Sequence, residues 1–530
     1  MATRSRTGAK AKAGAKKAAP RSAATKGKAA ATRAAESARA LKVETPPDPQ
    51  RVQSGVPRLD FILKGGFFRG GTYTLYGPPG AGKTIVANQF CFNRIALSGE
   101  TCVYLTVLAE SHAKMVHHLS GLTFFDPRVV GKQLKYIAAY QTLRSGGLDG
   151  VLKLVRTTLL KERPGVLVID GLESIEQAAG QRARAKEFLN QLQAFTALTQ
   201  TTTLLCAVEQ DGQARRDENA MVDGVIELSD KLVGPRAVRE LTVHKFRGSG
   251  YLRGRHEVEI TDAGIQIHPR TEIQFDAPPE QATEQRERMG FGVTELDRMM
   301  SGGMLSGSTL ALLGAPGSGK TTLGLSFLVE GAMRGHKGMY FGFYEPPPRL
   351  IERVEAMGIP LARHVKSGAI ELVWQPPLEH YMDSLAESLL ERVRAEKHAR
   401  RRLFIDGVQG FAAAAVYSER LPRFLSALCN QLRTWDVTTV ISEELPMFNP
   451  ELELPHPELA HVVETVVLLR YVELNSQLHR LLSIMKMRES GYDTSIREFS
   501  MRSGGIEVSG SFETAEQILS GFPRSRGSAS

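Results

Sequence analysis

Two glycine-rich segments carry the residue types needed to bind a phosphate chain. Both fit the pattern G-x-x-x-x-G-K-[ST], in which backbone N–H groups turn toward phosphate oxygens and the lysine is expected to neutralise the β- and γ-phosphates. The first segment consists of Gly77, Pro78, Pro79, Gly80, Ala81, Gly82, Lys83 and Thr84. The second consists of Gly314, Ala315, Pro316, Gly317, Ser318, Gly319, Lys320 and Thr321, with Thr322 as a further binding residue. The chain is therefore expected to bind nucleoside triphosphate at two sites.

Phosphoryl transfer also needs a carboxylate beside the metal ion. Downstream of each phosphate loop an apolar run ends in an aspartate, at Asp170 and Asp406. We expect each aspartate to hold Mg²⁺ through water. The hydroxyls of Thr84 and Thr321 are expected to ligate Mg²⁺ directly, because a hydroxyl is a hard oxygen ligand.

Hydrolysis further requires a group that orients water. Between each phosphate loop and its aspartate, a predicted strand ends near a glutamate, Glu110 in the first copy and Glu345 in the second. A carboxylate at that strand end is placed to polarise a water molecule in line with the γ-phosphate. The alternative is an ordinary surface or helix-capping glutamate.

A pair of cations occurs late in each copy of the pattern. Lys245 and Arg247 flank one residue, and so do Lys486 and Arg488. On a strand, positions i and i+2 point to the same side, so each pair favours an anion site. Because the pairs lie far in sequence from their own phosphate loops, they are expected to act on the γ-phosphate of a neighbouring subunit, as arginine fingers do. The alternative is a solvated edge strand.

These residues belong to a longer internal repeat. Lys83 recurs as Lys320, an offset of 237 positions, and the dipeptides at 55–56, 59–60 and 65–66 recur at the same offset. A gap-free repeat of this length indicates duplication. Short β-branched runs alternate with helical patterns in both halves. This alternation predicts an α/β fold with two tandem domains, each a mostly parallel sheet with helices on both faces.

Composition shifts place the boundaries of these domains. A Lys/Ala-rich segment covers residues 1–50, and the first domain is expected at 51–270. A linker with Pro278-Pro279 and alternating polar residues is expected at 271–288. The second domain then covers 289–508, and a C-terminal segment covers 509–530.

The net charge of +10 is concentrated in the N-terminal tail. Residues 1–42 hold twelve Lys and Arg and one acid, Glu36, so the rest of the chain is close to neutral. Because the tail has almost no large apolar side chains, it is expected to be disordered. A solvated tail, salt-sensitive contact with nucleic acid or another polyanion, and an organelle transit peptide are the open alternatives.

Other features exclude several classes of protein. No stretch approaches the ~20 apolar residues of a membrane helix, and no secretory signal is present, so no membrane partner is expected. Cys91, Cys102, Cys206 and Cys429 are scattered without a C-x-x-C pattern, which argues against a zinc site or a disulfide framework. This cysteine usage fits core residues in a reducing cytoplasm.

The combined motifs resemble the KaiC family of RecA-like ATPases over about residues 51–522. The resemblance is more specific than the phosphate loops alone, because it includes further segments late in each domain. These segments are residues 245–248 (KFRG), 468–473 (LLRYVE), 486–488 (KMR), 496–499 (IREF) and 511–521 (SFETAEQILSG).

The resemblance implies two tandem RecA-like domains in a two-tiered homo-hexameric ring with ATP and Mg²⁺ between subunits. It also implies slow ATP hydrolysis, a regulatory or signalling role with an unidentified protein partner, and, in clock members, Ser/Thr autophosphorylation in the second ring. The lead hypothesis is therefore a hexameric ATPase that acts as a switch. A DNA-acting ATPase that uses the basic tail, an ATP-dependent scaffold and a protein kinase are the alternatives.

The sequence also departs from the clock proteins of the resembled family. Those proteins carry two adjacent glutamates at the water-orienting position, whereas Ala109 and Tyr344 replace the first of each pair here. The adjacent Ser-Thr phosphoacceptors of the family fall on Ala460 and His461, and Thr465 aligns elsewhere. These departures favour a KaiC-like protein that is not a circadian oscillator.

Overall fold

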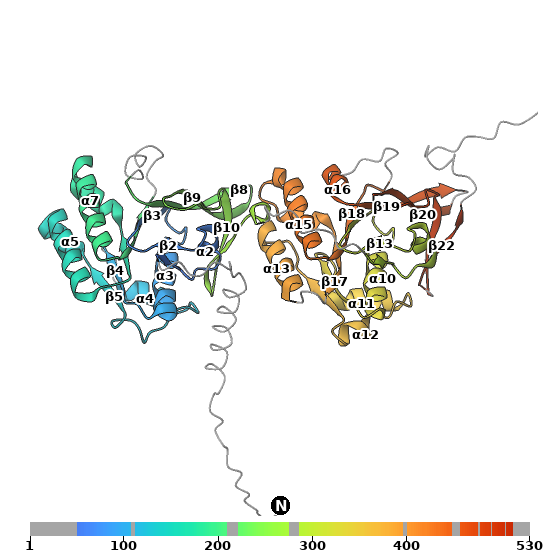
Figure 1. Ribbon diagram of the computed structural model, residues 1–530, viewed down its shortest axis with the longest axis horizontal. Helices are drawn as coiled ribbons and strands as arrows, with labels where there is room; N and C mark the ends of the chain where they lie inside the picture. Colours follow the sequence, from blue (N-terminus) through green and yellow to red (C-terminus); the bar gives the residue numbers. More distant parts are fainter. Residues whose placement is uncertain are drawn as a thin grey trace, which may run out of the picture. The chain divides into compact units, whose positions relative to one another are not determined.

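The computed structural model describes residues 50–107, 112–208, 221–274, 286–395, 400–447, 456–474, 477–488, 490–503 and 505–511 (Figure 1). The predictions for the basic tail, for Glu110 and for the chain beyond residue 511 lie outside these ranges. Within them the chain forms two compact units. The first comprises 50–230, 242–253 and 259–267, and the second comprises 231–241, 254–258 and 268–511.

The first half of the chain contributes a nine-stranded sheet in the order β11-β10-β9-β8-β3-β7-β6-β4-β5. Its strands are β3 (Thr72–Gly77), β4 (Cys102–Thr106), β5 (Leu134–Ala138), β6 (Val166–Asp170), β7 (Thr202–Val208), β8 (Gly224–Val233), β9 (Arg236–Phe246), β10 (Arg255–Thr261) and β11 (Gly264–His268). The helices are α2 (Leu59–Ile62), α3 (Lys83–Ser98), α4 (His112–Leu119), α5 (Tyr140–Glu162), α6 (Leu172–Ala179), α7 (Arg182–Leu198) and the 3-10 helix η1 (Thr271–Ile273). Strand β3 pairs in parallel with β7 and β8, and β4 pairs in parallel with β5 and β6.

The second half repeats this arrangement in the order β16-β15-β17-β18-β14-β19-β20-β21-β22. Its strands are β14 (Thr309–Gly314), β15 (Lys337–Gly342), β16 (Ile370–Trp374), β17 (Arg400–Asp406), β18 (Thr438–Glu444), β19 (Thr465–Leu474), β20 (Gln477–Met487), β21 (Arg497–Arg502) and β22 (Gly505–Ser511). The helices are α9 (Thr294–Met299), α10 (Lys320–Met333), α11 (Pro347–Glu355), α12 (Leu361–Lys366), α13 (Met382–Ala395), α14 (Val408–Ala414), η2 (Ser418–Arg420), α15 (Leu421–Thr434) and α16 (Pro457–Val462). Strands β14 to β19 are parallel, and β20 to β22 continue the sheet antiparallel.

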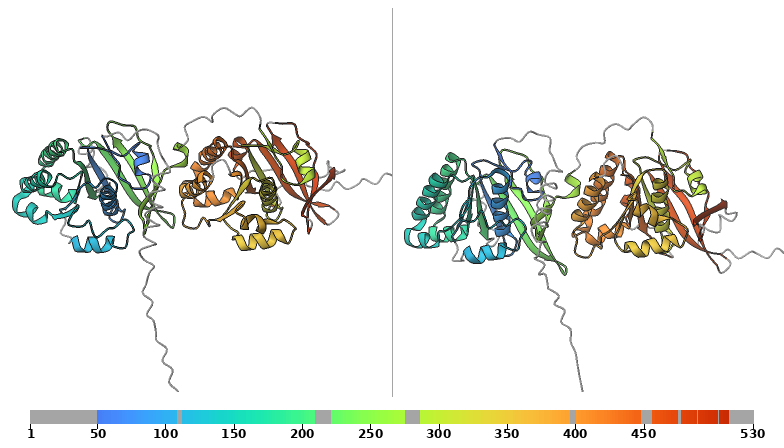
Figure 2. Two further views of the ribbon diagram at one scale, coloured as in Figure 1. Left: turned by 60° about the horizontal axis from the view of Figure 1, so that its bottom comes forward. Right: turned by 90° about the horizontal axis from the view of Figure 1, so that it is seen from below.

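Helices cover both faces of each sheet, as the sequence predicts. In Figure 2, α3 lies on one face of the first sheet and α5 and α7 lie on the other. In the second sheet, α13 to α15 and α10 to α12 divide the two faces in the same way (Figure 2). The expected α/β fold with two tandem domains is therefore confirmed.

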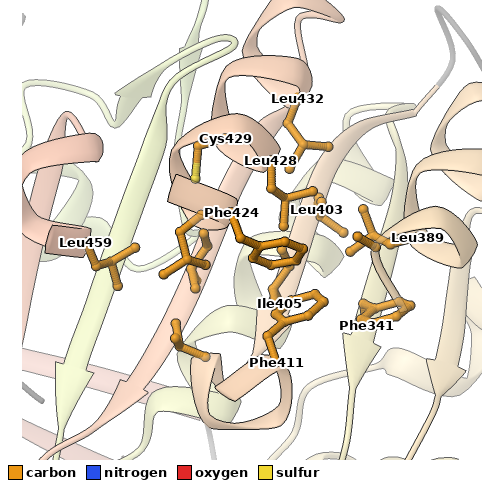
Figure 3. Packing of buried hydrophobic residues seen from close by; sticks show 14 of the residues in the cluster. Phe341, Leu389, Leu403, Ile405, Phe411, Phe424, Leu428, Cys429, Leu432 and Leu459 are labelled. Atoms are coloured by element: carbon orange, nitrogen blue, oxygen red, sulfur yellow. The ribbon is translucent and has the colours of Figure 1, made fainter. Parts of the chain in front are cut away.

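The second domain has a hydrophobic core on each face of its sheet, because the side chains of the buried strands alternate between the two faces. Leu403 and Ile405 of β17 pack with Phe411 and Phe424 on the side of α14 and α15 (Figure 3). Phe404, between them in sequence, belongs to the cluster on the opposite face. Because successive strand side chains point to opposite faces, a continuous apolar run is what a sheet covered on both sides requires.

The repeated aspartates near the start of each domain have a structural reason. Asp60 accepts backbone N–H bonds from Ser54 at 2.8 Å and Gly55 at 2.9 Å. Asp297 accepts the equivalent bonds from Phe291 at 2.6 Å and from the following glycine at 3.0 Å. Each carboxylate thus fixes the entry loop, which leads from β1 (Arg51–Val52) to β2 (Phe67–Phe68) or from β12 (Arg288–Met289) to β13 (Met304–Leu305).

Two further sequence-based expectations can be compared with the structure. All four cysteines are buried and none forms a disulfide, which agrees with their assignment to the core. Among the helices of the described ranges, none has the length and apolar character that crossing a membrane requires.

Candidate nucleotide sites

Each phosphate loop joins the central strand of its sheet to a long helix. The first runs from β3 to α3 and the second from β14 to α10, with Gly82 and Gly319 immediately before the helices. These glycines have φ values of 100° and 109°, which side-chain-bearing residues rarely adopt. A Cβ on Gly319 would also lie 2.7 Å from Phe499 Cε1. The helix N-terminus therefore directs its backbone N–H groups into the loop, as anion binding requires.

The loop lysines fold back over the cradle. Lys83 Nζ donates to Gly77 O at 2.7 Å and to Pro78 O at 2.8 Å. Lys320 Nζ makes the equivalent bonds to the carbonyl oxygens of residues 314 and 315, at 2.7 and 2.9 Å. Burial lowers the pKa of Lys320, and the nearby carboxylates of Glu444 and Asp406 oppose that shift. Both ammonium groups are thus held inside the loop where phosphate oxygens would lie.

The predicted magnesium ligands lie together in both domains. Thr84 Oγ1 donates to Asp170 Oδ2 at 3.4 Å, and Thr321 Oγ1 donates to Asp406 Oδ2 at 3.0 Å. Within the described residues, no group of three or more His, Cys, Asp or Glu gathers at a possible metal site. A single carboxylate and a hydroxyl fit Mg²⁺, which keeps several waters and takes further ligands from substrate phosphates. When bound, the ion would supply charge neutralisation at those phosphates.

A tyrosine supports each of these aspartates, and the sequence analysis did not single it out. Tyr104 donates its hydroxyl proton to Asp170 Oδ2 at 2.7 Å, and Tyr340 donates to Asp406 Oδ2 at 3.2 Å. In each copy the tyrosine precedes its aspartate by 66 residues, which is the signal that could have identified it. Burial is the largest cause that raises the pKa of both tyrosines, so both hydroxyls remain donors. Ser442 adds a bond to Asp406 Oδ1 at 2.8 Å.

The environment of Asp170 favours a cation. Burial raises the pKa of this carboxyl, and the hydrogen bond from Tyr104 and the charge of Lys83 oppose the rise. A buried carboxylate is stabilised by a positive charge at close range. A divalent cation would therefore be most favourable at this position when Asp170 is ionised.

Of the two predicted water-orienting glutamates, only Glu345 is described. Its carboxylate forms an ion pair with Arg353 of α11, with 2.7 Å between the charged atoms. Both side chains are partly exposed. Glu345 therefore follows β15 at the predicted position, and its carboxylate is paired with a cation of the same domain.

Both Lys-x-Arg pairs lie at the end of the sheet at which the central strand begins. Arg488 N donates to Glu464 O at 3.1 Å, and Glu464 N donates to Thr309 O, at the first residue of β14, at 3.0 Å. Arg247, Asp223 and Thr72 repeat this chain of bonds in the first domain, at 2.7 and 2.8 Å. The phosphate loops follow the other end of β3 and β14. The structure thus places each pair far from the cradle of its own domain.

The second cation pair also contacts α16. Lys486 Nζ donates to the carbonyl oxygens of Ala460 and Val463 at 2.6 and 2.8 Å, and Arg488 donates to His461 O at 3.2 Å. Burial and then the charge of Arg488 lower the pKa of Lys486. Ala460 and His461 therefore lie on a helix anchored by these two cations. Thr465 lies at the start of β19 and is only 2% exposed.

The fold and the two sites together define a P-loop ATPase with two tandem α/β domains. The chain belongs to the KaiC family, because the family model described as "ATPase: KaiC" matches residues 52–272 and 289–513. The resemblance identified in the sequence is thus confirmed.

Several curated relatives are similar along most of the chain. The circadian clock oscillator protein KaiC of Parathermosynechococcus lividus is 25% identical, and the match covers 89% of this chain and 87% of that protein. The protein of the same name from Synechococcus elongatus is 23% identical, over 89% of this chain and 92% of its own length.

Proposed function

We propose that this protein binds ATP with Mg²⁺ at the subunit interfaces of a homo-hexameric ring, hydrolyses it slowly, and acts as a regulatory or signalling switch. The observation that carries the proposal is the position of the Lys-x-Arg pairs. Each lies where the central strand begins, whereas the phosphate loop follows the end of that strand. Six residues in extended conformation separate the two ends by about 20 Å. A cation at that distance cannot contact a γ-phosphate in its own cradle, so a neighbouring subunit is the natural acceptor.

Assembly is the first test of this proposal. Light scattering should show monomers or small oligomers without nucleotide and hexamers with ATP and Mg²⁺. A protein that remains monomeric at saturating ATP would contradict both the ring and the assignment of the cation pairs to a neighbouring site.

Subunit mixing tests the shared site more directly. Lys320→Ala removes the cradle lysine and Arg488→Ala removes the cation of the pair, so each variant alone should lose second-domain hydrolysis. If the site is shared, a mixed ring contains interfaces with an intact cradle from one variant and an intact pair from the other. The mixture should then exceed the average of the two separate rates. The double variant, which carries both substitutions in every subunit, is the control. A mixture no faster than the average of the two separate rates would place both residues in one subunit's site.

The proposal has two finer parts. The ring keeps residual Ser/Thr autokinase activity, and a protein partner distinguishes its nucleotide states by affinity. The partner would bind one nucleotide state of the ring more tightly than the other, because only a differential affinity can transmit the state. A pull-down with ATP or ADP held on the ring tests this point, and equal recovery in both states would contradict it.

A DNA-acting ATPase is the second candidate, since residues 1–42 carry twelve cations. This number of cations in a short segment favours binding of nucleic acid and other polyanions. Single-stranded DNA should then stimulate ATP hydrolysis, whereas a ring that serves as a switch should hydrolyse ATP at the same rate with and without DNA.

A further inference from the structure

A second carboxylate lies at the end of the second sheet that carries the phosphate loop. Ser442 of β18 donates to Asp406, so its side chain lies on the face that carries the predicted magnesium ligands. Glu444 follows two positions later on the same strand and therefore lies on the same face. Glu443, between them, lies on the opposite face, where its Oε1 accepts bonds from the backbone N–H of His456 at 3.1 Å and pairs with that imidazole at 2.7 Å. Of these two adjacent glutamates, Glu444 alone faces the nucleotide side.

Strand register fixes Glu444 beside the cradle. It pairs with Gly314, the first residue of the phosphate loop, and Leu445 N donates to Gly314 O at 3.0 Å. Glu444 is exposed, whereas Glu443 is 1% exposed. The carboxylate therefore lies at an open position at the mouth of the loop.

The charge of Glu444 reaches two residues of the site. It opposes the effect of burial on the pKa of Lys320. At Tyr344 it adds to burial, which is the larger cause of the raised pKa of that phenol. Tyr344 replaces the first glutamate of the pair found in the clock proteins. The electrostatic interaction thus links Glu444 to the position where that carboxylate is missing.

The other carboxylates of the site are already engaged. Glu345 pairs with Arg353, and Asp406 accepts bonds from Thr321, Tyr340 and Ser442. Within the described ranges, no cation lies at ion-pair distance from the Glu444 carboxylate. At this end of the sheet, the Glu444 carboxylate therefore forms no ion pair with another group of the described chain.

The equivalent strand position of the first domain carries an apolar residue. The register of β3 with β7 pairs Gly77 with Val208, at the position equivalent to the pairing of Gly314 with Glu444. The two phosphate loops are nearly identical, but the neighbouring strand ends in an apolar residue in one domain and in an acid in the other. The strand position of Glu444 thus carries a carboxylate in the second domain and an apolar side chain in the first.

We infer that Glu444 is a water-orienting carboxylate of the second ATP site, in place of the glutamate that Tyr344 replaces. Its carboxylate accepts a hydrogen bond from the attacking water. The water oxygen forms a bond to the γ-phosphorus as the bond between that phosphorus and the β–γ bridging oxygen breaks, and ADP leaves with the electron pair. The proton released by the water passes to Glu444 and then to solvent. The inference rests on the proposed hydrolysis of ATP at this site.

Glu444→Gln in the full-length protein tests the inference, because it keeps the size of the side chain and removes its basicity. Lys320→Ala first defines the share of phosphate release that belongs to the second site. Glu444→Gln should lower that share about tenfold or more, and Glu444→Asp should restore part of it. Glu352→Gln, the same change at an exposed position of α11, is the matched control. Its phosphate release should equal that of the unmodified protein.

ATP affinity provides a readout that does not depend on turnover. Removing a negative charge near the γ-phosphate should leave the Kd for a fluorescent ATP analogue unchanged or lower it. If Glu444→Gln weakens binding in proportion to the loss of turnover, the residue only maintains the shape of the loop and the inference is wrong. If Glu444→Gln hydrolyses ATP as fast as Glu352→Gln does, the inference is also wrong and the proposed hydrolysis stands. An unmodified protein that releases no phosphate would instead contradict the proposed hydrolysis itself.

Discussion

Glu345 and Arg353 form an ion pair in the second domain, with 2.7 Å between the charged atoms. The pair occupies the carboxylate that the sequence pattern predicts to orient water. Glu345 follows β15, and Arg353 belongs to α11, the next helix along the chain. The ion pair is therefore expected to limit the predicted water-orienting role of Glu345.

Arg353→Gln should increase hydrolysis in the second domain. A partly exposed ion pair contributes about 0.2–1 kcal/mol, so release of the Glu345 carboxylate should raise the rate by up to about fivefold. Glu345→Gln should lower it, as Glu110→Gln should in the first domain, with ATP binding and hexamer formation preserved. Phosphate release at saturating ATP is the measurement. Unchanged hydrolysis in both glutamine variants would show that other groups orient the water.

The two loop lysines should each control one class of nucleotide site. Lys83→Ala and Lys320→Ala delete the ammonium group that faces the β- and γ-phosphates, so each variant should bind about half of the nucleotide bound by the unmodified protein. Equilibrium binding stoichiometry measures this directly. Full occupancy in both variants would contradict the assignment of the two loops as the binding sites.

Loss of either tyrosine hydroxyl should lower the affinity of its site for Mg²⁺. Groups that orient a metal ligand typically contribute 10- to 100-fold to metal affinity, so Tyr104→Phe and Tyr340→Phe should raise the Mg²⁺ concentration needed for half-maximal hydrolysis about tenfold. In the first domain the loss should also depend on pH. Because the bond from Tyr104 lowers the pKa of Asp170, its removal raises that pKa further, and the defect should grow as the pH falls.

Tyr492→Phe is the control for this experiment, since among the described residues its hydroxyl donates to the Met485 carbonyl oxygen, at 3.4 Å. A magnesium requirement that stays the same in all three variants would assign the two buried hydroxyls a purely structural role.

Autophosphorylation should be absent at positions 460 and 461. Phosphoryl transfer to Ser or Thr needs a side-chain oxygen as nucleophile, and Ala460 has none. Thr465 is an unfavourable alternative because it is only 2% exposed. Incubation with labelled ATP followed by mass spectrometry should therefore find no stoichiometric phosphate on residues 460–465. Phosphate on Thr465 would require the start of β19 to open, and would show that the kinase activity has moved to that residue.

Deletion of residues 1–42 should separate polyanion binding from catalysis. With twelve cations, DNA binding should lack sequence preference and should weaken by about 10³-fold or more between 50 and 200 mM salt. The shortened protein should lose this binding and keep its ATPase activity. If the deletion abolishes ATP hydrolysis instead, the segment has a structural role.

The sequence alone determined the features that depend on local chemistry and on alternation. The glycines and lysine of each phosphate loop are adjacent in the chain, so a short pattern identifies them. The apolar runs that end in Asp170 and Asp406 predict strands covered on both faces, because buried strands need apolar side chains on each side. The repeat then fixed two domains, and the additional segments late in each domain identified the family.

Tertiary structure alone decided the contacts made across strands and helices. Tyr104 lies 66 residues from Asp170 in the chain, and the pairing of β4 with β6 brings them together. The face of β18 separates Glu444 from Glu443, although the two are adjacent glutamates in the sequence. Arg488 likewise lies at the end of the sheet where β14 begins because β20 runs antiparallel to β19. These relations depend on register and strand direction, which are set by the packing of the whole sheet, and no short stretch of sequence records them.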